Sequence, residues 1–143
     1  MKRIFVALDS SERSKQVLNA AARLAELTDS KLILYRAIYV SPDSVNEARL
    51  ATTEVVVEDV LRRNAHAGLD SLAATLRAGL VEELVVEVAT PWDGICRDAR
   101  TRDADLIVIG SHGFGGIDHL LGTTAAKVVN HADRNVLVVR TLL

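Results

Sequence analysis

Five short runs of consecutive apolar residues alternate along this chain with segments in which apolar residues recur every three or four positions. An unbroken apolar run is typical of a strand that is buried on both faces, and the wider spacing is typical of an amphipathic helix. Strands that alternate with helices through a whole chain predict an α/β fold, in which a parallel sheet has helices on both faces. The predicted strands cover residues 4–8, 32–40, 84–88, 106–109 and 136–139.

Local signals mark where the predicted helices begin. Asp9 and the polar residues that follow it are typical N-cap residues for the first helix. Thr90 is a second predicted cap, followed by Pro91 at the first helical position. The predicted helices cover residues 14–27, 45–76 with an irregularity near 51–53, a segment that begins at 91, and 122–132.

The composition predicts a single domain. The chain has 143 residues, of which 49% are hydrophobic, so we expect one domain, residues 1–143, with a sizeable core. Only 3% of the residues are aromatic, so this core must consist of Val, Leu, Ile and Ala, a mixture that suits parallel sheets. The net charge is −2, from 17 basic and 19 acidic side chains, which argues against a nucleic-acid binder with a concentrated basic face.

Three further features predict a cytoplasmic protein that does not contact a membrane. The single cysteine, Cys96, excludes an internal disulfide and fits a reducing compartment. No apolar run approaches the roughly 20 residues that span a bilayer. The first apolar run ends at Asp9 and is too short for a signal peptide.

A glycine-rich segment lies between the fourth predicted strand and the last predicted helix. Gly110-Ser111-His112-Gly113 follows the strand, and Gly122-Thr123-Thr124 opens the helix. Glycines let an anion approach the backbone closely, and the first turn of a helix offers unpaired N–H groups at the positive end of its dipole. This order of elements predicts a phosphate site, and a tight connection without a ligand is the alternative. The segment has neither the lysine of a Walker A motif nor the third small residue of the dinucleotide-binding fingerprint.

Two polar features coincide at one edge of the predicted sheet. Asp9 directly follows the first predicted strand, and Gly110 directly follows the core of the fourth. The carboxyl ends of parallel strands share one edge, and ligands of such sheets bind beyond it. For Asp9, helix capping alone is the alternative. His112 lies between two loop glycines, where it either contacts phosphate oxygens or is a solvated loop residue.

No arrangement of side chains in the sequence predicts catalysis. Ser111 and Thr124 have no His–Asp pair to activate them as nucleophiles. His66, His119 and His131 lack the spacing of zinc ligands. We therefore assign no catalytic residue.

Three segments resemble the universal stress protein family. They are Val-Ala-Leu-Asp-Ser-Ser at 6–11, Gly-Ser-His-Gly at 110–113, and the tail from Ala132 to Arg140. The resemblance extends over the whole chain and includes the order of the elements. It implies a three-layer α/β/α sandwich with a five-stranded parallel sheet, of adenine-nucleotide alpha hydrolase-like architecture, and a homodimer.

The glycine spacing departs from the pattern of that family's nucleotide-binding members, which is G-x2-G-x9-G-[ST]. Here eight residues, not nine, separate Gly113 from Gly122. A missing residue before a helix rotates its first turn by about 100° if nothing compensates. Gly115 and Gly116 are permissive enough to absorb this change.

The resemblance also implies roles for individual residues. Asp9 would contact the ribose or a Mg²⁺ ion bound through the nucleotide, and Ala37 would lie against the adenine. Ala7 stands where some nucleotide binders have proline. The residues implied to bind ATP or another adenine nucleotide, with or without Mg²⁺, are Ala7, Asp9, Ala37, Gly110, His112, Gly113, Gly122, Thr123 and Thr124.

The sequence therefore predicts a dimeric universal stress protein that binds an adenine nucleotide as a stress-response regulator or sensor. One alternative is a dimer that binds no nucleotide and acts through protein partners, which the sequence does not identify. Another is a weak ATPase or phosphoryl-transfer enzyme, against which stands the lack of a loop lysine or arginine and of paired carboxylates. We expect the last strand, 135–141, to lie at the sheet edge and to pair with a second copy of the chain.

Overall fold

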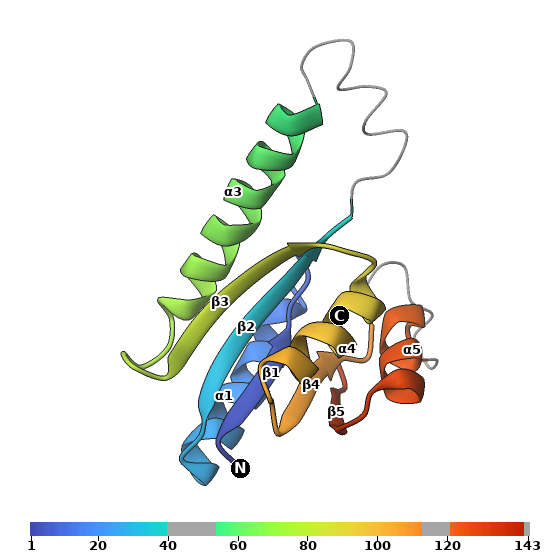
Figure 1. Ribbon diagram of the computed structural model, residues 1–143. Coiled ribbons are helices and arrows are strands. Elements are labelled where there is room, and N and C mark those ends of the chain that lie inside the picture. The colour runs from blue at the N-terminus through green and yellow to red at the C-terminus, as the bar shows by residue number, and fades with distance from the viewer. Residues whose placement is uncertain (40–53, 113–120, 142–143) are drawn as a thin grey trace.

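The computed structural model describes residues 1–39, 54–112 and 121–141. Over these ranges strands and helices alternate as predicted (Figure 1). The elements are β1 Arg3–Ala7, α1 Ser14–Thr28, β2 Lys31–Ile38, α3 Glu54–Ala73, β3 Val81–Val88, α4 Pro91–Thr101, β4 Leu106–Gly110, α5 Thr123–His131 and β5 Asn135–Val139. None of the helices in these ranges is both long enough and apolar enough to cross a bilayer.

The five strands form one parallel sheet in the order β3-β2-β1-β4-β5. β1 lies at its centre, with Phe5 opposite Ile33 of β2 on one side and Ile107 of β4 on the other. The chain therefore winds outward from β1 in one direction and then, after β3, returns to fill the other side. The α/β fold and the edge position of β5 are confirmed.

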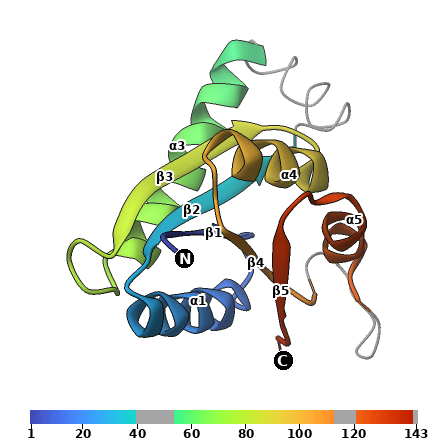
Figure 2. The same ribbon diagram turned by 60° about the horizontal axis from the view of Figure 1, so that its bottom comes forward.

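Helices cover both faces of the sheet, which makes three layers (Figures 1 and 2). Successive side chains of a strand point to opposite faces, and the two sets enter two separate cores. Ile4 and Leu34 pack with residues of α1 and α3 in one core, whereas Phe5 and Tyr35 pack with residues of α4 and α5 in the other. Burial on both faces is the reason why the strands are unbroken apolar runs.

α1 and α4 begin at the predicted residues, Ser14 and Pro91, but their predicted capping differs from the structure. α1 begins at Ser14 with Arg13 at its N-cap position, so Asp9 does not cap it and that expectation was wrong. Thr90 and Pro91 do occupy the N-cap and first positions of α4, but the Thr90 side chain makes no capping hydrogen bond. α3 is described from Glu54, and the predicted irregularity near 51–53 lies outside the described residues.

β3 begins three residues earlier than predicted, at Val81. Glu82 and Glu83 interrupt the apolar pattern there, and the pairing with β2 is irregular between Leu32 and Ile33. Both glutamates are held by arginines, Glu82 by Arg3 and Glu83 by Arg102. Charged side chains at the beginning of this edge strand thus interrupt the apolar pattern, so the sequence did not show where β3 begins.

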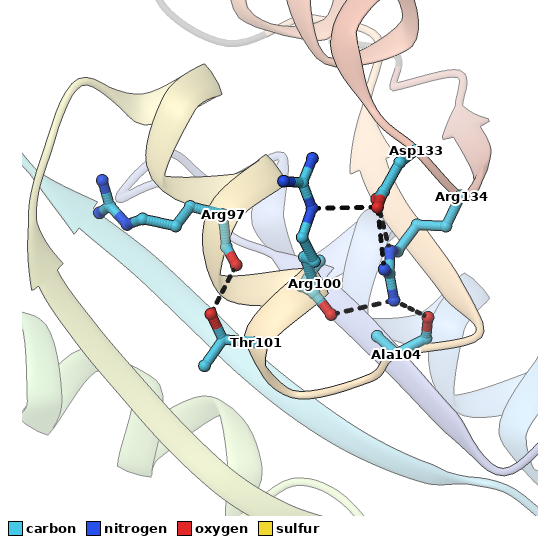
Figure 3. Close-up of polar contacts among 7 residues, drawn as sticks. Arg97, Arg100, Thr101, Ala104, Asp133 and Arg134 are labelled. Carbon is cyan, nitrogen blue, oxygen red and sulfur yellow. Dashed lines mark hydrogen bonds and ion pairs between the residues drawn. The ribbon is translucent and has the colours of Figure 1, made fainter.

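A cluster of charged residues joins the end of α4 to the beginning of β5 (Figure 3). Arg134 donates from Nη1 to the carbonyl oxygens of Ala99, at 3.2 Å, and Ala104, at 2.7 Å. Asp133 lies between Arg134 and Arg100 and accepts from both at 2.9 and 3.0 Å. The cluster fastens the amino-terminal end of β5, at the opposite edge of the sheet from the carboxyl ends of the strands.

Candidate functional site

A cavity of about 120 Å³ opens at the carboxyl edge of the sheet. It lies where the strand order reverses, because its wall includes the ends of β1, β2 and β4 together with the first turns of α1, α4 and α5. Such a switch point is where parallel α/β sheets bind their ligands. The two polar features that the sequence placed at this edge, Asp9 and Gly110, both line the cavity.

Small and apolar side chains form much of the cavity wall. Ala7 and Ala37 come from the neighbouring strands β1 and β2, and Ile109 comes from β4 on the other side of β1. Pro91 and Ile95 are contributed by the first turns of α4. These two small side chains leave room at the strand ends, and the apolar surroundings suit the face of a flat ring.

Asp9 closes a tight turn after β1. Its Oδ1 accepts hydrogen bonds from the Ser11 N–H at 2.9 Å and from the Ser11 hydroxyl at 2.6 Å. An aspartate that bonds the backbone two residues ahead forms an Asx turn. The carboxylate is thus held at the cavity by its own turn, three residues before the helix that was expected to use it as a cap.

Ser111 connects the two ends of the glycine-rich segment with the end of the chain that follows β5. The Ser111 carbonyl accepts from the Gly122 N–H at 2.7 Å, and the Ser111 N–H donates to the Val139 carbonyl at 2.8 Å. Its hydroxyl accepts from the Thr141 N–H at 3.1 Å and lies 3.0 Å from His112 Nδ1. The two ends of the glycine-rich segment are therefore hydrogen-bonded to each other, although the segment is one residue shorter than in the family pattern.

His112 is buried, with 6% of its surface exposed, and it lines the cavity. The interpretation of His112 as a solvated loop residue is therefore wrong. Because the Ser111 hydroxyl accepts the Thr141 N–H, its own proton is available to His112 Nδ1.

The predicted site residues fall into three groups. Six of the nine line the cavity, whereas Gly122 and Thr123 form the N-cap and first residue of α5 beside it. Gly113 lies outside the described residues. The six that line the cavity are Ala7, Asp9, Ala37, Gly110, His112 and Thr124.

Tyr35 and Arg36 are among the residues of the cavity wall that sequence reasoning missed. Tyr35 is 1% exposed, and its hydroxyl has no hydrogen-bond partner among the described residues. Burial and, next, the negative charge of Asp98 raise the pKa of Tyr35, so the hydroxyl keeps its proton. The hydroxyl ends against the backbone of Gly94 in α4, where any side chain would collide with it. The signal that could have found Tyr35 was a side chain with a hydroxyl group among the buried residues of a strand.

Arg36 is half-buried at the end of β2. Its Nε donates to the Leu8 carbonyl at 3.2 Å and its Nη2 to the Asp9 carbonyl at 2.7 Å. Burial lowers the pKa of Arg36, and the charge of Asp9 opposes that shift. A charged residue within an apolar run was the signal that could have found it.

Comparisons with known proteins identify the family of this chain. The model of the Universal stress protein family matches residues 1–140. Universal stress protein A homolog 2 of Coxiella burnetii is 33% identical over 140 residues, which cover 97% of this chain and 94% of that protein.

Solved structures share the fold. The hypothetical protein MJ0577 superposes with a TM-score of 0.82 at 22% identity, over 99% of this chain and 97% of that one. A universal stress protein solved in complex with cAMP has a TM-score of 0.64 at 27% identity, over 96% and 95% of the two chains.

Proposed function

Since the chain belongs to the universal stress protein family, we propose that it binds an adenine nucleotide at the carboxyl edge of its sheet and acts as a stress-response regulator or sensor. The observation that carries this proposal is the composition of one cavity. Its wall combines an apolar slot beside Ala7 and Ala37, the carboxylate of Asp9, and the beginning of the glycine-rich segment at Gly110. The relative that was solved with cAMP supports the same ligand class.

Each part of an adenine nucleotide has a chemical counterpart in the cavity. The base fits the slot beside Ala7 and Ala37, because an aromatic ring gains from small apolar neighbours. The ribose hydroxyls, or a Mg²⁺ ion held by the phosphates, fit the carboxylate of Asp9. Within the described residues no group of three or more His, Cys, Asp or Glu side chains gathers that could hold a metal ion.

The phosphates belong at the glycine-rich segment and the beginning of α5. Gly110 and Thr124 line the cavity, and Gly122 and Thr123 start the helix next to it. The first N–H groups of a helix attract anions, and among the described residues no side-chain capping bond is formed at the start of α5. Closure of the segment through Gly122 and Ser111 supports binding in spite of the missing residue.

We also propose that two copies of the chain form a homodimer by pairing through β5. This strand is at the edge of the sheet, and Leu137 on it is 40% exposed. An edge strand presents unpaired backbone groups that a second copy can satisfy around a twofold axis. Protein partners of the dimer would then respond to whether nucleotide is bound.

Titration calorimetry with ATP, AMP and cAMP, with and without Mg²⁺, tests the proposal. Ala37→Leu fills the slot and Gly113→Val obstructs the loop, so each should weaken binding at least about tenfold, or ~1.4 kcal/mol. Ala67→Leu is the matched control, since Ala67 is exposed on α3 away from the cavity. Failure of the unmodified protein to bind any of these nucleotides at millimolar concentration would contradict the proposal and favour a dimer that acts through partners alone.

A further inference from the structure

Arg36 brings a positive charge into the buried part of β2, which is apolar from Leu32 to Leu34. Its neighbours Leu34 and Tyr35 are fully buried, one in each core, and Arg36 itself is half-buried. Among the described residues no carboxylate forms an ion pair with it. A buried guanidinium keeps its charge, and removing it from water is unfavourable unless its donors are used. A half-buried arginine at this position of β2 is therefore unfavourable for stability unless its donors are used.

The donors of Arg36 are used on two consecutive carbonyls of another segment. The last backbone bond between β1 and β2 runs from the Leu8 N–H to the Tyr35 carbonyl, at 2.9 Å. Beyond it the strands no longer pair, and the Arg36 side chain takes over as donor to the carbonyls of Leu8 and Asp9. The planar guanidinium presents its N–H groups in a fixed fork. It therefore fixes the orientation of both peptide groups at the start of the Asp9 turn.

Gly68 makes room for this arrangement. A Cβ atom built on Gly68 would lie 2.5 Å from Nη1 of Arg36. Glycine inside a helix is unfavourable by roughly 0.5–1 kcal/mol relative to alanine, yet Gly68 is within the 20-residue helix α3. The guanidinium thus lies between the turn after β1 and the backbone of α3, and a Cβ atom at position 68 would require the end of the Arg36 side chain to shift.

We propose that Arg36, seated against Gly68, is the positioning residue that aims the Asp9 carboxylate into the cavity and thereby sets the affinity for nucleotide. The inference rests on the proposed function, because it assigns Asp9 to the ligand. Arg36 holds the peptide groups on which the Asx turn is built, and the turn holds the carboxylate. A shift of the guanidinium moves the carboxylate while the fold stays intact.

Gly68→Ala is the decisive variant, because Gly68 does not line the cavity. Alanine is the better helix former, and this gain opposes the cost of displacing the guanidinium, so the melting temperature should change little. The added methyl group pushes the end of Arg36 aside, and nucleotide affinity should fall. Ser71→Ala, an exposed change to alanine in the same helix, is the matched control and should leave affinity unaltered.

Substitutions of Arg36 itself distinguish the effect of its guanidinium hydrogen bonds from the effect of its apolar stem. Arg36→Met retains the apolar stem and removes the fork, so it should lose at least as much affinity as Gly68→Ala. Arg36→Lys keeps the charge and a single donor group, and partial rescue relative to methionine is expected. Equal affinity of the unmodified protein, Gly68→Ala and Arg36→Met would overturn the inference.

A measurement without ligand makes the inference independent of the proposed function. The Ser11 N–H is held by Asp9 Oδ1, so its hydrogen exchange reports the Asp9 turn. Exchange at Ser11 should accelerate in Gly68→Ala and Arg36→Met but not in Ser71→Ala. If the unmodified protein binds no nucleotide, the proposed function fails, and unaltered Ser11 exchange in both variants would still overturn the role of Arg36. Faster exchange with unaltered affinity would refute the part of the inference that concerns the ligand.

Discussion

Ser11 donates both its N–H and its hydroxyl to the same carboxylate oxygen of Asp9, at 2.9 and 2.6 Å. The turn that results ends before α1 begins at Ser14. The carboxylate is consequently not needed by the helix, and the turn holds it at the cavity. This separates the role of its charge from the role of its hydrogen bonds.

Asp9→Asn should leave stability nearly unchanged and weaken binding of Mg²⁺–nucleotide. The amide oxygen of asparagine accepts the two Ser11 bonds equally well, and asparagine is common in such turns. The lost charge removes the attraction for Mg²⁺ or for ribose hydroxyls. Thermal melting and calorimetry measure the two effects separately. Asp9→Ala, as a control, should lose about 1–2 kcal/mol of stability with the two bonds. Equal affinity of Asp9→Asn and the unmodified protein would leave Asp9 with a structural role only.

Gly94→Ala should destabilise the fold by about 1–3 kcal/mol, because overpacking forces a well-packed core to shift. The new methyl group would collide with the hydroxyl of Tyr35 and approach Ala89 Cβ to 2.9 Å. Urea unfolding measures the loss. Tyr35→Phe alone should be nearly neutral, since it removes a buried hydroxyl with no partner among the described residues. In the double variant part of the loss should be recovered, and strict additivity would show that the hydroxyl is not the obstacle.

Asp105→Asn should make stability less sensitive to acid. Asp105 Oδ2 accepts from the N–H groups of Lys2 and Arg3 at 2.7 and 2.9 Å. The bond from Arg3, followed by that from Lys2, lowers the pKa of Asp105 below its ordinary value of 3.8. A lowered folded-state pKa stabilises the fold above the unfolded-state value, and this stabilisation is lost as the pH falls through the folded-state value. Urea unfolding should show the variant converging on the unmodified protein below about pH 4. A difference that is constant from pH 6 to pH 3 would contradict the prediction.

Val138→Pro and Leu137→Lys should each convert the proposed dimer into a monomer. The Val139 carbonyl accepts from Ser111 on the β4 side, so the backbone groups of its neighbour Val138 point away from the sheet. Proline at 138 removes an outward N–H without breaking the β4 pairing. Lysine at 137 puts a charge on an exposed apolar side chain of the same strand.

Light scattering after size-exclusion chromatography measures the mass of these variants. Leu27→Lys is the control, since Leu27 on α1 is 76% exposed and lies far along the chain from β5. An unaltered dimer in both β5 variants would place the interface elsewhere.

The fold was predictable because burial on both faces makes each strand visible as an apolar run. The residues that end β1 and β4, Asp9 and Gly110, were predictable as site residues for the same reason, since topology alone brings strand ends together. The start of β3 was not predictable from the sequence, because arginines from other segments neutralise its glutamates.

Other details depend on contacts between distant segments. His112 is buried because Ser111 and Thr141 meet around the end of β5. Arg36 reaches the Leu8 and Asp9 carbonyls because of the register between β1 and β2 and because glycine occupies position 68 of α3. Neither contact leaves a local pattern in the sequence, so spacing and composition did not reveal them.

The central position of β1 also governs how the protein is made. Phe5 leaves the ribosome ~100 residues before Ile107, its partner on one side. At 5–20 residues per second, this edge of β1 stays unpaired for roughly 5–20 seconds of synthesis. An apolar strand edge is open to other chains throughout that interval. The pace of translation and the availability of chaperones therefore decide how much of the newly made protein escapes aggregation.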